Sequence, residues 1–160
     1  MAVDFFLKLE GVKGESKDSK HKDEIDILAW SWGVTQTGSV HLGGGAGTGK
    51  ANAQDINFTK YIDLSSPVLA RFCASGKHVP KATFNVRKAG DKPLEYIKIN
   101  LTDVLVSSYQ TGGSSGDERI VESFSLNFAK IEYQYFTQAQ SGAADKDEKM
   151  VFNAQENTWE

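Results

Sequence analysis

The sequence predicts a mainly β fold, an antiparallel β-barrel or sandwich that carries one short α-helix. Most segments alternate apolar and polar residues with a period of two, as strands with one buried face do. Turn signals such as Lys88-Ala89-Gly90-Asp91-Lys92-Pro93 separate these segments, and only one segment has convincing helical spacing. The 160 residues contain no internal repeat and have the length of one domain, so we expect residues 1–160 to form a single domain.

Three strands are expected before the helix. The first spans 3–9 and places four apolar residues on one face: Val3, Phe5, Leu7 and Leu9. Segment 10–24 is dense in Lys, Asp and Ser, which predicts a solvated and mobile loop. The second strand, 25–34, has one bulky face that includes Trp30 and Trp32, and one face of small residues: Ala29, Ser31 and Gly33. The third strand spans 54–62.

The helix is expected at 65–76. A serine cap precedes Pro67 in the first turn, and Gly76 provides the stop. Four residues share one face at helical spacing: Val68, Leu69, Phe72 and Cys73. Cys73 is the only cysteine, so no intramolecular disulfide can form, and we interpret it as a small core residue.

Strands at 82–87, 94–106 and 120–136 follow the helix, with a hairpin loop at 111–117. The last strand changes phase, because Phe124, Leu126 and Phe128 have one parity and Ile131, Tyr133 and Tyr135 have the other. A β-bulge or bend is therefore expected near Ala129 and Lys130, as barrels and two-sheet folds require for closure. Residues 138–149 are small and polar and predict a linker or flexible tail before a short strand at 150–152.

A glycine-rich stretch has two competing interpretations. It reads Gly43, Gly44, Gly45, Ala46, Gly47, Thr48, Gly49 and Lys50. The spacing from Gly44 to Lys50 fits half of a phosphate-binding loop, but the next residue is Ala51, where that motif needs Ser or Thr. A strand pattern follows instead of a helix. The sequence therefore favours a loop between two strands.

No catalytic or cofactor-binding constellation is recognisable. The three histidines, His21, His41 and His78, lack the spacing of a zinc site and are interpreted as solvated loop residues. No acid–base pair or nucleophile elbow can be assigned. The net charge of −3 and the lack of a concentrated basic surface argue against a nucleic-acid or anionic-membrane partner. We therefore expect no enzyme, no metal and no cofactor.

The N-terminus lacks the basic region and long apolar stretch of a signal peptide, and the apolar runs are too short for a transmembrane helix. This predicts a cytoplasmic protein or export by a route without a leader. Two other classes stay open on the residues alone. One is a carbohydrate-binding β-sandwich that uses five aromatic residues as stacking platforms: Trp30, Trp32, Tyr109, Tyr133 and Tyr135. The other is a hydrolase on a β-barrel.

Several segments are similar to a known family. They include Ala29-Trp30-Ser31-Trp32-Gly33 within 24–33, together with 1–4, 11–18, the glycine-rich loop with Lys50, 54–63, 75–78, 87–90, 104–108 and 127–129. In these segments the chain resembles the Hcp (haemolysin-coregulated) proteins, which form the inner tube of the bacterial type VI secretion system. The resemblance covers roughly residues 1–135, and nothing is carried over to 136–160.

The resemblance implies a β-barrel of two sheets with a helix on its flank, assembled into six-membered rings. Such rings stack into a hollow tube that a contracting sheath drives, tipped by a spike, into a neighbouring cell. The implied partners are other copies of the chain, sheath and spike proteins, and small effector proteins inside the ring. Export without a cleaved leader agrees with the missing signal peptide.

Two sites can be expected within such a tube. Small and polar residues suit a channel that must release its cargo, so Ala29, Ser31 and Gly33 are predicted to face the lumen. The alternative is that Ser31 only fits beneath a crowded core. The loop 42–50, which contains the glycine-rich stretch ending at Lys50, is expected to reach the adjacent ring or subunit. The alternative is a simple strand connector.

Overall fold

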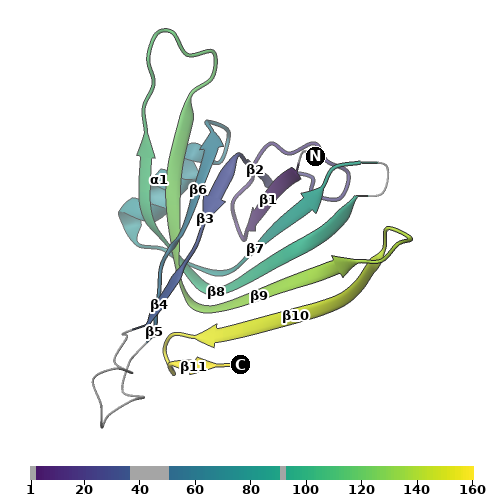
Figure 1. The fold of residues 1–160 in the computed structure, drawn as a ribbon. Coiled ribbons are helices and arrows are strands. Elements are labelled where there is room, and N and C mark those ends of the chain that lie inside the picture. The colour runs from purple at the N-terminus through teal and green to yellow at the C-terminus, as the bar shows by residue number, and fades with distance from the viewer. Residues whose placement is uncertain (1–2, 37–50, 91–92) are drawn as a thin grey trace.

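A computed structural model describes residues 3–36, 51–90 and 93–160 and shows strands wrapped around one core, with a single helix (Figure 1). The elements are β1 (Val3–Leu9), β2 (Ile25–Ile27), β3 (Ala29–Ser31), β4 (Val34–Gln36), β5 (Ala51–Ala53), β6 (Ile56–Tyr61), α1 (Ser66–Ser75), β7 (His78–Lys88), β8 (Leu94–Thr111), β9 (Val121–Gln138), β10 (Ala144–Asn153) and β11 (Thr158–Trp159). The described strands pair antiparallel throughout. The predicted mainly β fold with one short helix is confirmed.

The long hairpin of β8 and β9 organises the fold, because each of its strands has 18 residues and takes part in two sheet regions. The first half of β9 pairs with β6, and the second half pairs with β10. The pairings lead from β3 through β6, β9, β8, β7 and β1 to β2. Only Leu28 separates β2 from β3, so this series of pairings begins and ends in the single segment 25–31.

The predicted change of phase in β9 is confirmed, and it involves β8 as well. In both strands the buried side switches from odd to even positions, or the reverse, at the same place along the hairpin. The buried residues on either side of this switch are Leu101 and Val104 in β8, and Phe128 and Ile131 in β9. Between the first two, Asp103 adopts a left-handed φ of 54°. The register is kept at this level, and the shift occurs further along, between Val106 and Ser108. The change of parity is therefore accompanied by the unusual backbone of Asp103 and not by a register shift, and the extra residue of the β8–β9 pairing is Ser107.

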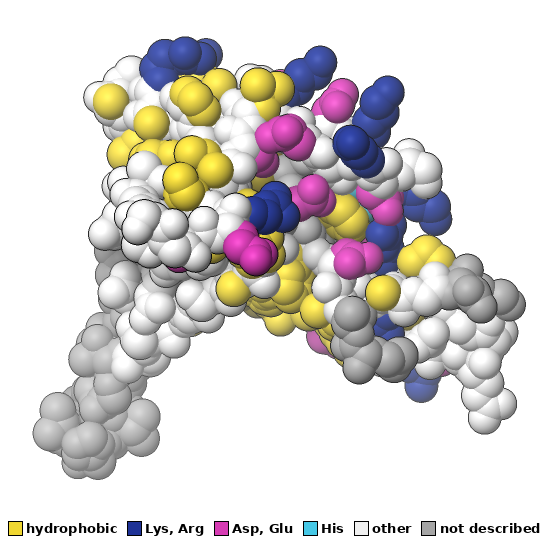
Figure 2. Space-filling view, turned by 90° about the horizontal axis from the view of Figure 1, so that it is seen from above, with side chains coloured by type: hydrophobic (Ala, Val, Ile, Leu, Met, Phe, Trp, Pro, Cys, Tyr) yellow, Lys and Arg dark blue, Asp and Glu magenta, His cyan; other side chains and the backbone are white. Residues whose placement is uncertain are grey.

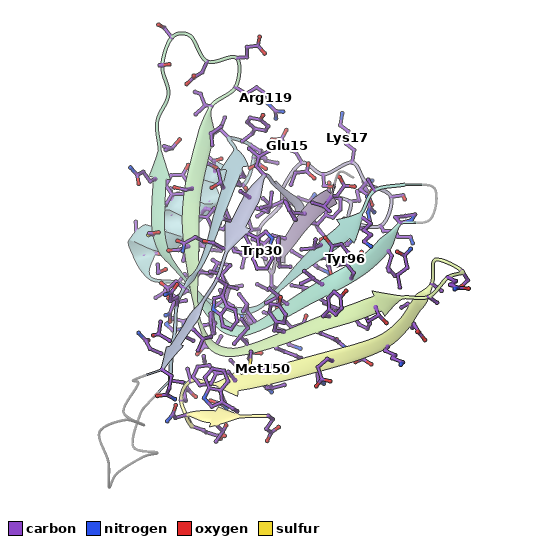
Figure 3. All side chains as sticks on the ribbon, in the orientation of Figure 1. Glu15, Lys17, Trp30, Tyr96, Arg119 and Met150 are labelled. Atoms are coloured by element: carbon purple, nitrogen blue, oxygen red, sulfur yellow. The ribbon has the colours of Figure 1, made fainter. Side chains whose placement is uncertain are left out.

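An aromatic cluster joins the two sheet regions across the core. The Phe58 ring lies 5.1 Å from Phe84 of β7 and 5.2 Å from Phe124 of β9. Trp30 adds a contact at 5.1 Å to Phe84, and Figure 3 shows its side chain between β3 and the β7–β8 hairpin. The three phenylalanine rings are nearly fully enclosed and Trp30 is partly buried, so the cluster supplies much of the apolar burial that stabilises the fold.

The helix forms where it is expected, with Leu69 and Phe72 buried and Gly76 at a left-handed φ of 67°. Ser65 occupies the N-cap position, as predicted, but its side chain makes no capping bond. Asp63 and Ser66 stabilise the turn that leads into the helix. The Asp63 carboxylate accepts the Ser65 amide at 2.9 Å, and the Ser66 hydroxyl accepts the Asp63 amide at 2.9 Å.

Segment 10–24 is not the solvated loop that its composition suggests. Val12, Ser16 and His21 are buried, and Gly14 lies so close to the chain that an added Cβ would come within 2.4 Å of the Glu24 carbonyl oxygen. The segment is ordered because it shields Phe6, an apolar side chain on the outer face of β1, from solvent. The His21 ring stacks on it at 4.3 Å.

Two other strand predictions require correction. The predicted strand 25–34 is interrupted and forms β2, β3 and the start of β4. The predicted linker 138–149 instead contains most of β10, a strand whose residues 144–149 are exposed on both faces and therefore show no apolar alternation. Charged side chains on such a strand protect an edge against unwanted pairing. Trp159 of β11 packs back on Phe152 at a ring distance of 3.9 Å.

Candidate functional site

The outward side of the sheet formed by β3, β6, β9 and β8 carries small, uncharged side chains. The pairing registers place them in two rows, Ala29–Thr59–Ser123–Gln110 and Ser31–Asn57–Ser125–Ser108. With Asn127 at the next outward position of β9, these residues form what we call the polar face. Most of them are exposed. In Figure 2 the left-hand surface below the yellow patch is mostly white, whereas blue and magenta side chains mix further right.

The polar face has a shallow hollow near the hairpin end of β8 and β9. Its volume is about 420 Å³, and its lining includes Thr59, Gln110 and Ser123 of the face itself. Glu122 contributes to the wall, although its side chain is fully buried. The hollow offers hydroxyl and amide groups to a ligand, which suits hydrogen bonding to another protein more than the binding of an apolar molecule.

Charged residues lie directly beneath this end of the polar face. Lys60 and Glu122 are both fully buried, and their Nζ and Oε1 atoms are 2.5 Å apart. Lys60 Nζ also donates to the Asp63 carboxylate at 2.8 Å and to the Ser66 hydroxyl at 3.1 Å. The hydroxyls of Ser66 and Tyr109 donate to Glu122. This Lys60 cluster (Lys60, Asp63, Ser66, Tyr109 and Glu122) ties β6, β8 and β9 to the start of α1.

The Lys60 cluster changes the titration of its tyrosine. Burial, with the hydrogen bond to Glu122 as the second cause, raises the pKa of Tyr109 to about 12. The phenol therefore remains a neutral donor to the carboxylate far above neutral pH. Because the cluster is enclosed and internally paired, it is suited to holding the sheet and helix together and not to meeting a substrate.

A second charged cluster secures segment 10–24 over β1 and β7. Arg87 donates to both carboxylate oxygens of Asp18, at 3.0 and 2.6 Å, and to Asp4 at 3.2 Å. The hydrogen bond from Arg87 is the main cause that lowers the pKa of Asp18 to about 2. Burial is the main cause that raises the pKa of nearby Asp26. A cleft of about 510 Å³ lies at this place.

The structure separates the two faces of the predicted lumen strand. Ala29 and Ser31 are exposed on the polar face, while Trp30 packs against the core. Gly33 lies beyond β3, where an added Cβ would come within 3.1 Å of the Gln54 side chain. Trp32 donates from Nε1 to the Gln54 carbonyl at 2.9 Å. Whether Ala29, Ser31 and Gly33 face a lumen stays a prediction, and Gly43 to Lys50 lie outside the described residues.

The histidines and aromatic residues give little support to the other function classes. His21 is buried, so its interpretation as a solvated residue is wrong. His78 is exposed and hydrogen-bonds Asp103 at 2.8 Å. His41 lies outside the described residues. No group of three or more His, Cys, Asp or Glu in 3–36, 51–90 and 93–160 is placed to hold a metal ion. Of the five candidate stacking residues, only Tyr135 is exposed, at 45%.

Comparison with known proteins identifies the family of this chain. Residues 6–135 match the family described as "Type VI secretion system effector, Hcp". The protein hcp1 of Pseudomonas aeruginosa is 56% identical over 146 residues, which cover 91% of this chain and 90% of that protein. The chain belongs to the Hcp family. It is therefore an inner-tube protein of type VI secretion, in a family of structural proteins and not of enzymes.

Two solved structures have the same fold as this chain. Hcp1 from Salmonella typhimurium is 37% identical, with a TM-score of 0.82 and full coverage of both chains. A type six secretion system protein is 31% identical, with a TM-score of 0.90 over 99% of this chain and 100% of that chain. No helix in the described part of this Hcp chain is long and apolar enough to cross a membrane.

Sequence reasoning found only one strand of the polar face. It missed the outward residues of the other three strands: Asn57, Thr59, Ser108, Gln110, Ser123, Ser125 and Asn127. The available signal was the alternation of small polar residues with Phe124 and Leu126, which marks one side of β9 as hydrophilic. What the sequence could not supply was the pairing register that brings these residues beside Ser31.

Proposed function

We propose that six copies of this Hcp protein close into a ring whose lumen is lined by the polar face. Rings then stack into a hollow tube that the sheath propels behind the spike, and small effector proteins travel inside. The sheath, the spike and these effectors are the partners of this proposal. The observation that carries it is the pair of neutral rows across four strands, which include the predicted lumen residues Ala29 and Ser31.

The chemistry of the polar face supports a lumen assignment. In soluble proteins an exposed sheet face usually carries charged side chains. Neither row of the polar face contains a charged residue. Short neutral side chains leave room for cargo and offer hydrogen bonds that are individually weak in water. A channel lined in this way can hold a protein during transport and release it afterwards.

A closed ring requires two different patches on each subunit that join head to tail. The solution mass of the purified protein, measured by light scattering after size exclusion, tests this directly. We expect a mass near that of six chains and rings in negative-stain images. A monomer over a wide concentration range would contradict the proposal.

The glycine-rich loop and the lumen strand can each be tested separately. We propose that the loop 42–50 contacts the adjacent ring or subunit, so deletion of residues 43–49 should leave the chain folded and reduce stacking. Tubes that form normally after this deletion would show that the loop is only a strand connector.

Replacing Ser31 by Glu should leave the ring mass unchanged and weaken the retention of co-expressed effectors. Unchanged retention would show that Ser31 does not face the lumen.

We also propose that the protein resides in the bacterial cytoplasm before assembly and leaves through the type VI system without cleavage of a leader. Intact-mass spectrometry of the protein recovered from culture medium tests this proposal. The expected mass is that of the full chain, with at most the initiator methionine removed. A truncated N-terminus in a secretion-competent strain would show that a leader had been cleaved.

A further inference from the structure

We propose that Asp55 is a docking point for a cationic side chain, arginine or lysine, on a protein held against the polar face. The inference rests on the proposed function, because the ligand would be cargo in the lumen. Asp55 lies between β5 and β6, and its carboxylate reaches across the sheet. It accepts Asn127 Nδ2 at 2.8 Å from β9 and the Ser107 hydroxyl at 2.7 Å from β8.

The serine hydroxyls around Asp55 have one consistent orientation. Ser107 lies 2.7 Å from Ser125, which in turn lies 2.5 Å from Ser108. A hydroxyl has a single proton, and Ser107 donates its proton to Asp55. Ser107 must therefore accept from Ser125, and Ser125 must accept from Ser108. All three protons point towards the carboxylate, in a chain whose bonds polarise one another.

This order leaves acceptors at the surface. An ionised carboxylate has about four lone-pair positions, and the two described side-chain bonds to Asp55 use two of them. The Ser108 oxygen also keeps lone pairs, while the protons of all three serines are already engaged. A ligand with N–H donors is therefore favoured over a ligand with acceptors. Arginine presents such donors in a planar fork that fits a carboxylate.

The charge of Asp55 is not compensated within the described part of the chain. None of the ion pairs found there includes Asp55. The nine residues of the polar face are all neutral, so the Asp55 carboxylate presents a negative charge next to a neutral surface. Charge complementarity thus selects a cationic occupant in preference to an anionic one.

Binding of fluorescent peptides to the full-length protein tests the proposal. One short Gly/Ser peptide carries arginines, and a second carries citrulline, a neutral isostere, at the same places. We expect the native protein to bind the arginine peptide more tightly, with the difference shrinking between about 20 mM and about 500 mM salt. Asp55→Asn should weaken arginine-peptide binding by about threefold and leave citrulline-peptide binding unchanged.

Asp145→Asn is the matched control, because it removes one exposed carboxylate from β10 and causes the same change in net charge. The proposal would be overturned if both variants lost the same affinity for the arginine peptide, or if Asp55→Asn lost none. A changed oligomeric mass in Asp55→Asn would also overturn it, because Asp55 would then be a contact between copies. If the native protein is a monomer, the ring proposal fails, but the peptide comparison still measures the Asp55 site.

Discussion

The polar face and the Lys60 cluster are the outer and inner sides of the same strands, and they reverse the usual distribution of charge. Thr59 and Ser123 face outward and are neutral, while their neighbours Lys60 and Glu122 face inward, fully buried and charged. Charged residues are normally exposed and rarely buried. The difference indicates that each inner charge needs its buried partner for the fold to be stable, whereas the neutral outer surface meets a demand other than folding.

The largest effect should follow from breaking the buried pair. Glu122→Ala leaves Lys60 enclosed with Asp63 as its remaining carboxylate partner and removes the acceptor of the Ser66 and Tyr109 hydroxyls. We expect the free energy of unfolding to fall by about 3–5 kcal/mol. Urea denaturation followed by circular dichroism provides the measurement.

The double variant Lys60→Met, Glu122→Leu is the control for this loss. It replaces the charges by apolar groups of similar size, so much of the stability lost in Glu122→Ala should return. A loss of unfolding free energy below about 1 kcal/mol in Glu122→Ala would show that buried Lys60 does not depend on Glu122 as its partner. The contrast between a Lys60 cluster needed for stability and a polar face that is not would then be wrong.

A smaller effect should distinguish two serines that lie on opposite sides of the sheet. Ser66 is 2% exposed, and its hydroxyl accepts Lys60 Nζ and the Asp63 amide, so Ser66→Ala should cost about 1–3 kcal/mol. Ser108→Ala on the polar face should change stability by at most about 0.5 kcal/mol. Parallel urea titrations of the two variants give the comparison, and similar losses would contradict the division of roles.

Alkaline pH should destabilise the Lys60 cluster without acting on the neutral polar face. In the folded protein the pKa of Tyr109 is raised to about 12 from the ordinary tyrosine value of 10.0, so folding favours the neutral phenol. Its contribution is fully present below about pH 10 and is lost as the pH rises through 12. Stability measured between pH 9 and 12, at about half-unit steps, should therefore fall less steeply in Tyr109→Phe than in the native protein. Equal slopes would contradict the assignment.

The sequence predicted the parts of this molecule whose signals are local. Pro67 and Gly76 bound the helix, and the apolar alternation within β9 revealed the phase change that the structure shows at Asp103. The alternation of Trp30 with Ala29 and Ser31 likewise predicted the two-sided character of β3.

The parts that were missed depend on partners distant in sequence. His21 is enclosed because it hydrogen-bonds Glu95 and stacks on Phe6, neither of which lies in its own segment. Ser108 lies beside Ser125 only because the register shifts at Ser107. The edge strand β10 has no apolar alternation across its exposed residues, so no periodicity could reveal it.

The smallest expected effect is the sharpest test of the comparison. Ser31→Lys introduces a charge at the β3 edge of the polar face, where the native side chain is exposed and contributes little to packing. The unfolding free energy should therefore change by at most about 0.5 kcal/mol, although the same substitution should alter what the assembled protein retains. Thermal or urea unfolding combined with retention of co-expressed effectors measures both quantities in one variant. A substantial loss of stability would mean that folding itself requires the neutral outer residues, and their composition would no longer be evidence for a lumen.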